Sequence, residues 1–569
     1  MCTQRSNCLK LLAVLADSNN FNNIKGIFLN ILNLILYIIS SKMQAMIEKF
    51  EIFSDEMSES KYVTYLVGIS VFLAPVLTYL SYANLAAFVL ASPLLIRYSE
   101  WWVKELQVAW SGYLLSLKAK EHHKYLTSST KKSSSKIRIT PPIVKYTPRD
   151  LGDSLAFKPL TISKKLTLKN RMIRAAAFGG STVNDLIDCH REVAKGGAAM
   201  TTIAYACVSP DGRTFKQQLL LNEEHDPDIK KKLKSIVKNI HDCDCKISIQ
   251  LTHGGGFADP SVCPKRRTIA PSSIFNPAAM NWPTEMTMDD MKRVQNDFIN
   301  AAVLCKKVGF DAVELHCGHG YLLSQFLSPF TNRRRDSFGG STRAKGNILN
   351  RLKFPLRVLD GIREKCGKEF PIFVKFNVHD GFDQGIQLFD VITAAKKFEE
   401  HGANMLIPSG GFVSRNGLYM LRGNVPLLRM AKAMPGLLKT VATVLLGPLF
   451  VPTTVFEECF FRKEARLVKN NVNIPVCLIG GITSLQTIEG ALREEFQCVQ
   501  MARAIIRKPD IINDWKTFLM PSRSKNKLDD HQHEDDGKEI LNSQCSHCNM
   551  CVVSTLDPTL GMKCVERSF

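Results

Sequence analysis

From about residue 155 onward, short β-branched or apolar runs alternate with amphipathic stretches, and this alternation constrains the fold more than any other feature. The runs predict the strands Met172–Ala177, Ala198–Val208, Lys246–Leu251, Ala312–His316, Ile372–Asn377, Asn404–Ser409, Val476–Ile479 and Val499–Ala504. The amphipathic stretches predict helices such as Asp289–Val308, Leu349–Lys365, Phe389–His401 and Leu485–Arg493. Strand–helix alternation is typical of a parallel sheet, and this number of repeats predicts an α/β fold of the (β/α)8 TIM-barrel type.

An open doubly wound sheet is the alternative arrangement of the same repeats. Its nucleotide-binding form carries a GxGxxG motif after the first strand. No such motif follows Met172–Ala177. The sequence therefore favours the closed barrel.

The region before the barrel has a different character. Residues 62–96 form a run of 35 positions without a charged side chain, and a helix of roughly 20 apolar residues is enough to cross a bilayer. We therefore predict an N-terminal membrane-associated helical region over residues 1–126, either one long span or a hairpin broken near Pro75.

Residues 97–150 hold eleven Lys and Arg against four Asp and Glu, and positive flanks stay on the cytosolic side. The expected location is an intracellular membrane, with membrane lipid as a partner and the barrel facing the cytosol.

Composition shifts divide the chain into four parts. The membrane-anchoring region 1–126 is followed by a polar linker, 127–154, whose Ser- and Lys-rich start has no means of forming a core. The barrel is expected over 155–520, and a charged loop with a cysteine-rich tail over 521–569. An apolar insert at 440–456 interrupts the repeats, and we expect a lid or packing helix there, with a second membrane contact as the alternative.

The composition is that of a folded, basic protein. Hydrophobic residues make up 45% and charged residues 22% of the chain, which excludes wholesale disorder. The net charge of +21 fits a membrane surface, an anionic ligand or nucleic acid. Nucleic acid has little support, because the basic residues are not interleaved with aromatic ones in a known binding motif. The 17 cysteines are too few for a disulfide-stapled secreted domain.

Polar and small residues follow the predicted strands at the edge where a TIM barrel carries its chemistry. The third, fourth and fifth strands end at Gln250, His316 and Lys375, and the last two run into Gly480–Gly481 and Ala502–Arg503. Glycine lets backbone N–H groups approach phosphate oxygens, and arginine adds a charged contact. These residues predict a phosphate site after strands seven and eight.

The segment 309–341 (GFDAVELHCGHGYLLSQFLSPFTNRRRDSFGGS) has the highest density of reactive side chains. His316 and His319 are three positions apart, and Tyr321 follows two residues later. Two imidazoles can donate hydrogen bonds to one oxygen, and a nearby phenol can give a proton. The alternative is that these are satisfied polar residues of a surface loop.

This segment resembles the old yellow enzyme family of FMN-dependent oxidoreductases, whose pattern reads HxxHGYLxxxFLSPxxNxRxDxYGGS. Other segments follow in the order of that family: LKNRMIRAAA (168–177), GGAAMTT with VSPDGR (196–213), SIQLTHGG (248–255), APSS (270–273), VKFN with DG (374–381), SGG (409–411), PVCLIGGI (475–482) and VQMARAIIRKPD (499–510). The resemblance covers about residues 155–569.

The resemblance implies a barrel that binds FMN and takes a hydride from NAD(P)H. In the flavin site it implies backbone contacts from Ala175, Ala176 and Ala177, with Gln250 at the pyrimidine edge and Lys375 near N1 and O2. The residues implied at the ribityl phosphate are Gly411, Gly480, Gly481, Ala502 and Arg503. Ala502 stands where the family usually has glycine.

For the substrate, the resemblance implies that His316 and His319 bind a carbonyl oxygen above the flavin. Hydride transfer from flavin N5 would then reduce an activated C=C bond, and Tyr321 would protonate its α-carbon. The expected activity is reduction of enone- or enoyl-type small molecules. The alternatives are a flavin dehydrogenase that passes electrons to an external carrier, and a catalytically silent flavin barrel tethered to a membrane.

Four cysteines crowd the end of the chain with the spacing Cys545-x2-Cys548-x2-Cys551-x12-Cys564. Short loops of this kind hold metals, and four thiolates suit a [4Fe–4S] cluster or zinc. The placement resembles the iron–sulfur loop of the 2,4-dienoyl-CoA reductase and trimethylamine dehydrogenase branch, which implies electron transfer to an external carrier. Free thiols without a metal are the remaining alternative.

Overall fold

The computed structural model describes residues 143–567 except 181, 340–346, 418, 434–453, 521–539 and 557–560. The predicted membrane-associated region 1–126, the start of the linker, most of the apolar insert 440–456 and the charged loop lie outside these residues. Among the helices that are described, none is long and apolar enough to cross a membrane.

Eight parallel strands form one barrel in the described part of the chain. They are β3 (Met172–Arg174), β4 (Met200–Cys207), β5 (Lys246–Thr252), β8 (Ala312–Cys317), β9 (Ile372–His379), β10 (Met405–Gly410), β11 (Cys477–Ile479) and β12 (Cys498–Met501). β12 pairs with β3, and a parallel bridge between Leu406 and Val476 brings the two ends of the sheet together. The predicted strands and the (β/α)8 barrel are confirmed, and the open doubly wound sheet is wrong.

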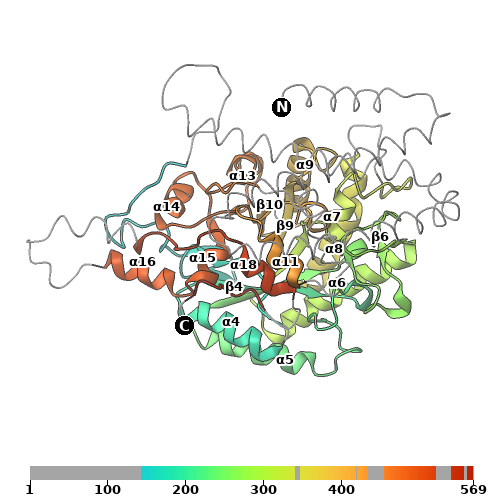
Figure 1. Cartoon of the computed structure of the whole chain (residues 1–569), viewed down its shortest axis with the longest axis horizontal. Coiled ribbons are helices and arrows are strands. Elements are labelled where there is room, and N and C mark those ends of the chain that lie inside the picture. Colours follow the sequence, from blue (N-terminus) through green and yellow to red (C-terminus); the bar gives the residue numbers. More distant parts are fainter. Residues whose placement is uncertain are drawn as a thin grey trace, which may run out of the picture. The chain divides into compact units, whose positions relative to one another are not determined.

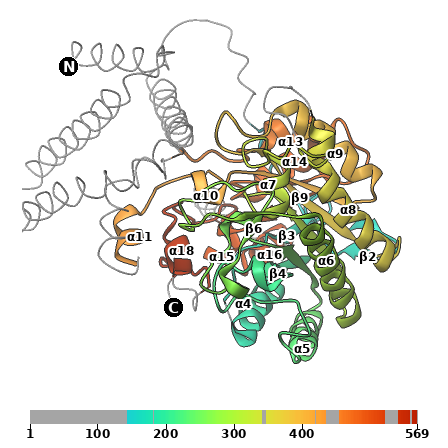
Figure 2. The same ribbon diagram turned by 90° about the vertical axis from the view of Figure 1, so that its right-hand side faces the viewer.

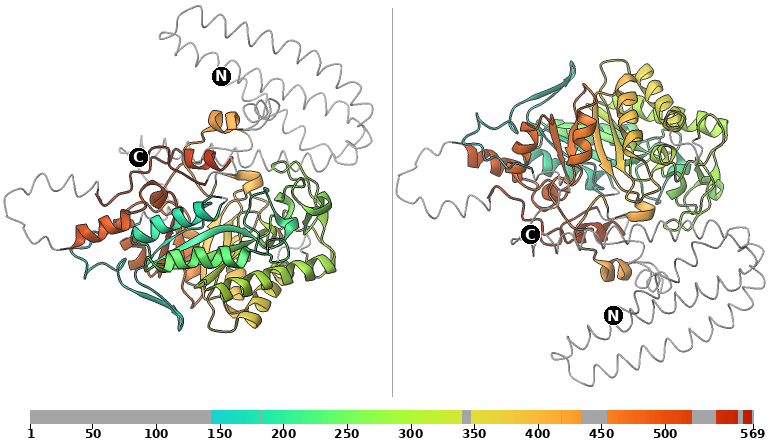
Figure 3. Two further views of the ribbon diagram at one scale, coloured as in Figure 1. Left: turned by 90° about the horizontal axis from the view of Figure 1, so that it is seen from below. Right: turned by 90° about the horizontal axis from the view of Figure 1, so that it is seen from above.

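The longer helices surround the strands (Figures 1 and 2), and the views from below and above show the same outer layer (Figure 3). They are α4 (Val183–Lys195), α5 (Ile229–His241), α6 (Met288–Val308), α8 (Ile348–Cys366), α9 (Leu388–Glu400), α13 (Arg462–Lys469), α14 (Leu485–Arg493) and α16 (Ile511–Leu519). The four helices expected from the sequence are confirmed to within one residue at each end.

Short elements interrupt the loops that follow the strands. The short helices are α7 (Leu322–Leu327) after β8, α10 (Val413–Asn416) and α11 (Leu427–Ala433) after β10, α15 (Arg503–Arg507) after β12, and α18 (Met550–Val553) in the tail. The 3-10 turns are η3 (Pro210–Gly212), η4 (Gly255–Phe257), η5 (Pro264–Arg266) and η6 (Ser554–Leu556), and a parallel pair β6 (Ile269–Ala270) and β7 (Thr284–Glu285) lies after β5.

Local sequence sets where the helices begin and end. In α6 the side chains of Thr287 and Asp290 accept each other's backbone N–H groups at 3.1 and 3.0 Å, which is a capping box. The helix ends at Gly309, whose φ of +103° lies in the left-handed region that favours glycine.

Apolar side chains fill the amino-terminal end of the barrel. A hairpin of β1 (Leu160–Ser163) and β2 (Leu166–Leu168) packs Leu166 and Leu168 into the same cluster as side chains from the starts of the strands. The strand members of that cluster include Ile173, Met200, Ala312, Phe373, Met405, Cys477 and Cys498. Because this end is closed by packed apolar atoms, the chemistry has to lie at the opposite, carboxyl end.

Candidate active site at the carboxyl ends of the strands

A buried ion pair lies one layer above the apolar end of the barrel. The ammonium of Lys375 on β9 is 2.8 Å from Oε1 of Glu314 on β8, and both side chains are almost fully buried. Gln250 on β5 donates to Oε1 of the same carboxylate at 2.7 Å, and Gln500 on β12 donates to Oε2 at 3.2 Å. Four strands therefore contribute to one polar layer.

Side chains alternate between the two faces of each strand, and this alternation places the four polar residues in one layer. Glu314, Lys375 and Gln500 each stand two positions after an apolar residue of the closed end, so they point to the same face of their strands. Gln250 and Lys375 were predicted to lie here from the sequence, whereas Glu314 and Gln500 were not. A charged residue inside the otherwise apolar run AVELHC was the signal for Glu314, because a buried charge requires a partner.

The two predicted histidines meet above this layer. The ring centroids of His316 and His319 are 4.9 Å apart and the rings are nearly perpendicular, at 87°. His319 has a positive φ of 60°; its N–H donates to Oδ1 of Asn377 at 2.8 Å, and its Nε2 lies 2.7 Å from Oγ of Ser409. The Gly318 N–H donates to Nδ1 of His316 at 3.4 Å, which assigns the proton of that ring to Nε2.

Both imidazoles are neutral at physiological pH. Burial lowers the pKa of His316 well below its ordinary value, and the nearby His319 and Lys375 lower it further. Burial, followed by the charge of Lys375, lowers the pKa of His319 to about 3. A neutral imidazole presents one N–H donor and keeps it, so the pair can polarise an oxygen without releasing a proton.

Tyr321 completes this group. Its ring centroid lies 4.8 Å from that of His316 and 4.9 Å from that of Tyr205. Burial raises the pKa of Tyr321 to about 12, against a smaller opposite effect of its hydrogen bond with Tyr205. The phenol is therefore protonated at neutral pH. The structure brings all three predicted catalytic residues into one buried site.

Tyr205 is a further residue of the site that was not predicted from the sequence. It lies at an irregularity in the pairing of β4 with β5, between Ile203 and Ala206, and has a φ of 66°. Bulges of this kind re-aim side chains next to active sites, and such a φ is strained for a bulky residue. Gln250 accepts the N–H of Tyr205 at 3.2 Å, and the Tyr205 hydroxyl lies 2.5 Å from that of Thr214. A run of apolar and small residues gives no sign of this bend.

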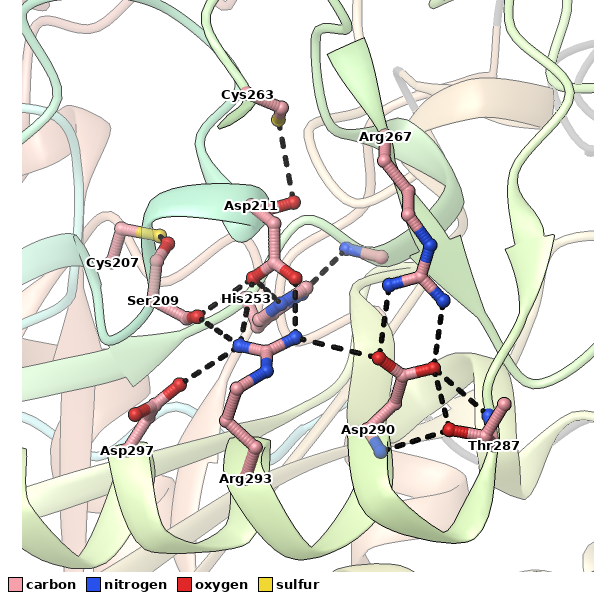
Figure 4. A network of polar contacts seen from close by, with 11 residues as sticks. Cys207, Ser209, Asp211, His253, Cys263, Arg267, Thr287, Asp290, Arg293 and Asp297 are labelled. Carbon is pink, nitrogen blue, oxygen red and sulfur yellow. Dashed lines mark hydrogen bonds and ion pairs between the residues drawn. The ribbon is translucent and has the colours of Figure 1, made fainter. Parts of the chain in front are cut away.

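A polar network supports the loops beside the site (Figure 4). The carboxylate of Asp211 accepts hydrogen bonds from Ser209 at 2.7 Å, His253 at 3.2 Å and Arg293 at 2.5 Å. Arg293 on α6 also lies 3.8 Å from Asp290. Burial raises the pKa of Asp211, but its bonds to His253 and Arg293 outweigh burial and lower it below the ordinary value. The network ties the loop after β4 to the end of β5 and to α6.

This network connects directly to the histidine–tyrosine loop. The carbonyl of His253 accepts the N–H of Leu322 at 2.9 Å. The Gln325 side chain donates to the carbonyls of Gly254 at 3.1 Å and Gly320 at 2.7 Å. The turn after β5 and the segment 318–322 are therefore held as one unit.

The three glycines expected at the phosphate have positive φ angles, a backbone conformation that favours glycine. The φ angles of Gly411, Gly480 and Gly481 are +100°, +106° and +72°. A Cβ at Gly480 would lie 2.8 Å from Phe461, and one at Gly481 would lie 2.6 Å from the carbonyl of Glu457. Glycine lets backbone N–H groups come close to the oxygens of an anion, so these positions suit a phosphate.

Arg503 already has partners in the chain. Its guanidinium donates to the carbonyl of Arg422 at 2.9 Å, to Oδ1 of Asn549 at 2.7 Å and to the carbonyl of Leu421. These bonds leave further N–H groups for a phosphate. Through these bonds Arg503 also connects the end of β12 to the tail.

The cysteine-rich tail packs beside the expected flavin backbone. Ala177 and Ala502 share an apolar cluster with Cys551 and Cys564, and the N–H of Met562 donates to the carbonyl of Phe178 at 2.8 Å. Ala175 and Ala176 precede this contact, and the Ala175 N–H donates to the carbonyl of Met501 at 2.8 Å. Helix α18 of the tail lies beside α11 (Figure 2).

The four tail thiols influence one another, although the structure does not confirm a metal centre. Burial raises the pKa of Cys551 to about 11, Arg503 lowers it, and Cys545, Cys548 and Cys564 raise it. In the described segments, no group of three or more His, Cys, Asp and Glu side chains is placed to hold a metal ion. The described cysteines are free thiols.

Comparison with known proteins identifies the family of this barrel. Residues 155–412 match the NADH:flavin oxidoreductase / NADH oxidase family. The chain is 35% identical over 419 residues to the 4,4'-dithiodibutanoate disulfide reductase of Rhodococcus erythropolis, which covers 72% of this chain and 94% of that protein. The chain belongs to the NADH:flavin oxidoreductase / NADH oxidase family. The resemblance to old yellow enzymes is thereby confirmed.

Two further comparisons place this flavin oxidoreductase among its relatives. It is 26% identical over 408 residues to the NADH oxidase of Thermoanaerobacter brockii, covering 71% of this chain but only 54% of that one. The structure of 2-naphthoyl-CoA reductase in complex with 2-naphthoyl-CoA matches with a TM-score of 0.54 and 21% identity, over 72% of this chain and 56% of that chain. This structural match shows a shared fold.

The family implies FMN as the cofactor and NAD(P)H as the reductant, and the residues of this flavin oxidoreductase fit FMN. The buried Oε1 of Gln500 has no hydrogen-bond partner, so it can accept a bond from a bound group. Lys375, which contacts the same Glu314 carboxylate as Gln500, supplies a buried cation that suits an anionic reduced flavin. The positive-φ glycines Gly480 and Gly481 and the arginine Arg503 suit the phosphate.

We expect the Glu314→Gln variant of this flavin oxidoreductase to be less stable by about 3–5 kcal/mol, because it leaves the buried Lys375 unpaired. Adding Lys375→Met should recover a large part of this loss, since the double variant has no buried charge at this place. Urea unfolding of the wild type, both single variants and the double variant gives the coupling free energy.

The control is Glu400→Gln, which breaks the exposed pair of Lys397 and Glu400 and should change stability by less than about 1 kcal/mol. Additive effects of the two buried substitutions would contradict the role assigned to the pair.

The neutral His319 predicts a pH dependence of stability. Its pKa is about 3 in the folded chain and about 6.5 in the unfolded chain. Between pH 7 and pH 5 only the unfolded chain takes up this proton, so the free energy of unfolding falls by about 2 kcal/mol from this group. Unfolding at both pH values should show that the His319→Asn variant loses correspondingly less stability on acidification. The exposed His225→Asn is the control, and an equal loss in wild type and His319→Asn would contradict a neutral buried imidazole.

Proposed function

We propose that this chain uses NAD(P)H and FMN to reduce activated C=C bonds of enone- or enoyl-type small molecules. The observation that carries the proposal is the neutral pair of His316 and His319 beside the protonated Tyr321 in one buried site. When bound, the flavin supplies a hydride from N5 to the β-carbon of the alkene.

The histidines bind the carbonyl oxygen of the substrate. Donors fixed in a buried site stabilise the negative charge that develops on that oxygen, and they need no reorganisation during the reaction. Asn377 holds the backbone N–H of His319, Ser409 contacts its ring at Nε2, and the bond from Gly318 orients the proton of His316 toward Nε2. Because both rings are neutral, they orient the substrate and do not protonate it.

Tyr321 supplies the proton to the α-carbon. Its phenol is the protonated group of the trio, and a positioned acid of this kind accelerates a proton transfer. Tyr205 acts as a positioning residue, because its hydroxyl bonds that of Tyr321 and is itself held against Thr214 at 2.5 Å.

The Tyr321→Phe variant should reduce bound FMN at nearly the wild-type rate and lose about 100-fold or more in the reoxidation by an enone. Anaerobic stopped-flow absorbance of the flavin separates the two half-reactions. Tyr146→Phe is the matched control, because this hydroxyl bonds Asp153 away from the site. An equal loss in both half-reactions would refute the role of Tyr321 as proton donor.

A second candidate substrate class is disulfides, which are also two-electron electrophiles. The support is the 35% identity to a disulfide reductase over 94% of its length. Cleavage of an S–S bond needs no protonation of carbon, so Tyr321→Phe should affect it much less than the enone step. Mixing the reduced protein with 4,4'-dithiodibutanoate or with an enone shows which one reoxidises the flavin faster. A catalytically silent barrel would hold a flavin that NAD(P)H does not reduce.

We further propose that the tail holds a [4Fe–4S] cluster that links the flavin to an external electron carrier. Support comes from the spacing of the four cysteines and from the packing of Cys551 and Cys564 against Ala177. The thiols bind the iron, and Arg503 lies in their electrostatic field.

Anaerobic purification should yield about four iron atoms per chain and a broad absorbance shoulder at about 400–420 nm. Cys551→Ser should lose both signals, whereas Cys243→Ser, outside the tail, should keep them. One zinc and no iron would assign the site to zinc, and the absence of both metals would leave free thiols.

We also propose that residues 1–126 attach the chain to an intracellular membrane with the barrel in the cytosol. The support is the uncharged run 62–96 followed by the basic stretch 97–150. Pelleting with membranes by the full chain, but not by a chain that starts at residue 127, is the expected result, and equal pelleting of both would refute the tether.

A further inference from the structure

A proton that Tyr321 gives to a substrate has to be replaced before the next turnover. The two histidines beside it are no source, because both imidazoles are neutral and keep their single proton. The neighbouring ring of Phe257, at a centroid distance of 6.0 Å, carries no exchangeable proton. In the described part of the chain, the hydroxyl group that bonds Tyr321 is that of Tyr205.

Three hydroxyl groups form a continuous chain that starts at Tyr321. Tyr321 directly precedes α7, Tyr205 lies in β4, and Thr214 follows η3. The ring centroids of Tyr321 and Tyr205 are 4.9 Å apart, and their hydroxyls are hydrogen-bonded. The Tyr205 hydroxyl also lies 2.5 Å from that of Thr214. Because a hydroxyl can accept one hydrogen bond while it donates another, a proton can pass along this chain.

The hydrogen bonds of the chain favour one direction of transfer. Burial raises the pKa of Tyr205 well above its ordinary value, the nearby Tyr321 raises it further, and the bond to Thr214 lowers it. Burial raises the pKa of Tyr321 to about 12, and the bond to Tyr205 lowers it. A hydrogen bond lowers the pKa of a phenol when it is donated to the phenolate oxygen, because it stabilises the anion. Thr214 therefore donates to Tyr205, and Tyr205 donates to Tyr321.

The outer end of the chain lies near the protein surface. Thr214 is half-buried, and Lys216, two residues later, is exposed. The amide oxygen of Gln218 accepts the Thr214 N–H at 2.8 Å and lies 3.3 Å from its hydroxyl oxygen. The threonine hydroxyl thus has a second acceptor besides Tyr205. Turning between the two acceptors returns the chain to its starting arrangement after a proton has passed.

The backbone holds Tyr205 in a strained conformation at this place. Its φ of 66° is unfavourable for a bulky side chain. Gln250 accepts its N–H at 3.2 Å, and the Gln218 side chain donates to its carbonyl at 2.9 Å. Its ring also stacks on Phe215 at 6.3 Å, a contact that a phenylalanine would keep. Strain of this kind gathers at functional sites, and the group that this position adds to the site is the hydroxyl.

We propose that Tyr205 and Thr214 relay a proton from the solvent to Tyr321 in each turnover. The relay deepens the proposed function, on which it rests. The α-carbon takes the proton of Tyr321, and the new C–H bond uses the electron pair left by hydride addition at the β-carbon. The hydrogen of Tyr205 then moves to the Tyr321 oxygen, and that of Thr214 moves to the Tyr205 oxygen. A hydronium ion of the solvent, which becomes water, restores the hydrogen of Thr214.

Stopped-flow absorbance of the full-length holoprotein tests the relay. Tyr205→Phe should slow the reoxidation of the flavin by an enone by about tenfold or more. Flavin reduction by NAD(P)H should change by less than about twofold, and so should reoxidation by ferricyanide, because neither step takes a proton from Tyr321. Thr214→Val should also slow the enone step, and Thr214→Ser, which keeps the hydroxyl, should restore it.

Two matched controls remove a hydroxyl elsewhere. Tyr146→Phe and Thr161→Val should leave all three rates unchanged, since these hydroxyls bond Asp153 and Thr167 away from the site. Equal losses in the enone and ferricyanide steps of Tyr205→Phe would overturn the relay, because they would indicate general damage to the site.

Mixtures of H2O and D2O count the protons that move in the enone step. Several hydroxyl protons in motion should give the wild type a curved dependence of rate on deuterium fraction, and Tyr205→Phe should give a straight line. A merely structural role of Tyr205 would lower the rate and leave the curvature. A straight line in the wild type, or equal curvature in wild type and variant, would therefore overturn the proposal.

A titration without any substrate separates this inference from the proposed function. With 3,5-difluorotyrosine, a more acidic phenol, at position 321, fluorine NMR follows the pKa of that phenol. Tyr205→Phe should raise this pKa by about one unit, because the phenolate loses a hydrogen bond. A raised pKa in a protein that reduces no enone would refute the proposed function and support the hydroxyl chain. An unchanged pKa in a protein that does reduce enones would refute the relay and leave the proposed function intact.

Discussion

The buried ion pair of Lys375 and Glu314 is the interaction on which the rest of the site depends. Two charges are stable in a barrel interior only when each has its partner and the remaining hydrogen-bonding groups are satisfied, and Gln250 and Gln500 provide those bonds at 2.7 and 3.2 Å. The pair separates the apolar amino-terminal end of the barrel from the polar carboxyl end. It also adds to the effect of burial on the two imidazoles: burial lowers the pKa of both, Lys375 lowers that of His319 further, and His319 followed by Lys375 lowers that of His316 further.

The chemistry of the site follows from geometry that the barrel alone would not provide. The loop that carries His319 and Tyr321 is a turn with a positive φ at His319, and the Tyr321 N–H donates to the carbonyl of Gly318 at 3.3 Å. Its shape comes from neighbours: Gln325 binds the carbonyl of Gly320, and the Asp211–His253 network holds the adjacent turn. A rigid loop is required because neutral donors act on a developing oxyanion only when they are already in place.

Much of this arrangement could be predicted from the sequence. The parts that could not be predicted have one physical cause in common. The strands and helices follow from periodicity, and His316, His319, Gln250 and Lys375 follow from their positions at strand ends. The role of Tyr205 depends on a pairing irregularity in β4, and the partners of Arg503 come from residues 421–422 and from Asn549. These contacts join segments far apart in the chain, so no local pattern encodes them. The four tail cysteines have the sequence spacing of a metal site. Spacing along the sequence does not determine where the four thiols lie relative to one another in the folded chain.

The sequence by itself determined a (β/α)8 barrel with an uncharged segment before it, a set of reactive side chains at the carboxyl ends of the strands, and a resemblance strong enough to indicate a flavin. Period-2 and period-3.6 patterns determine the barrel because burial of apolar side chains is repeated in every unit, whereas the flavin is implied by the resemblance of the motifs alone. Only the tertiary structure decided that Glu314 neutralises Lys375 and that Tyr205 reaches Tyr321. Each of these depends on which loops become neighbours when the barrel closes, and closure is a property of the whole sheet.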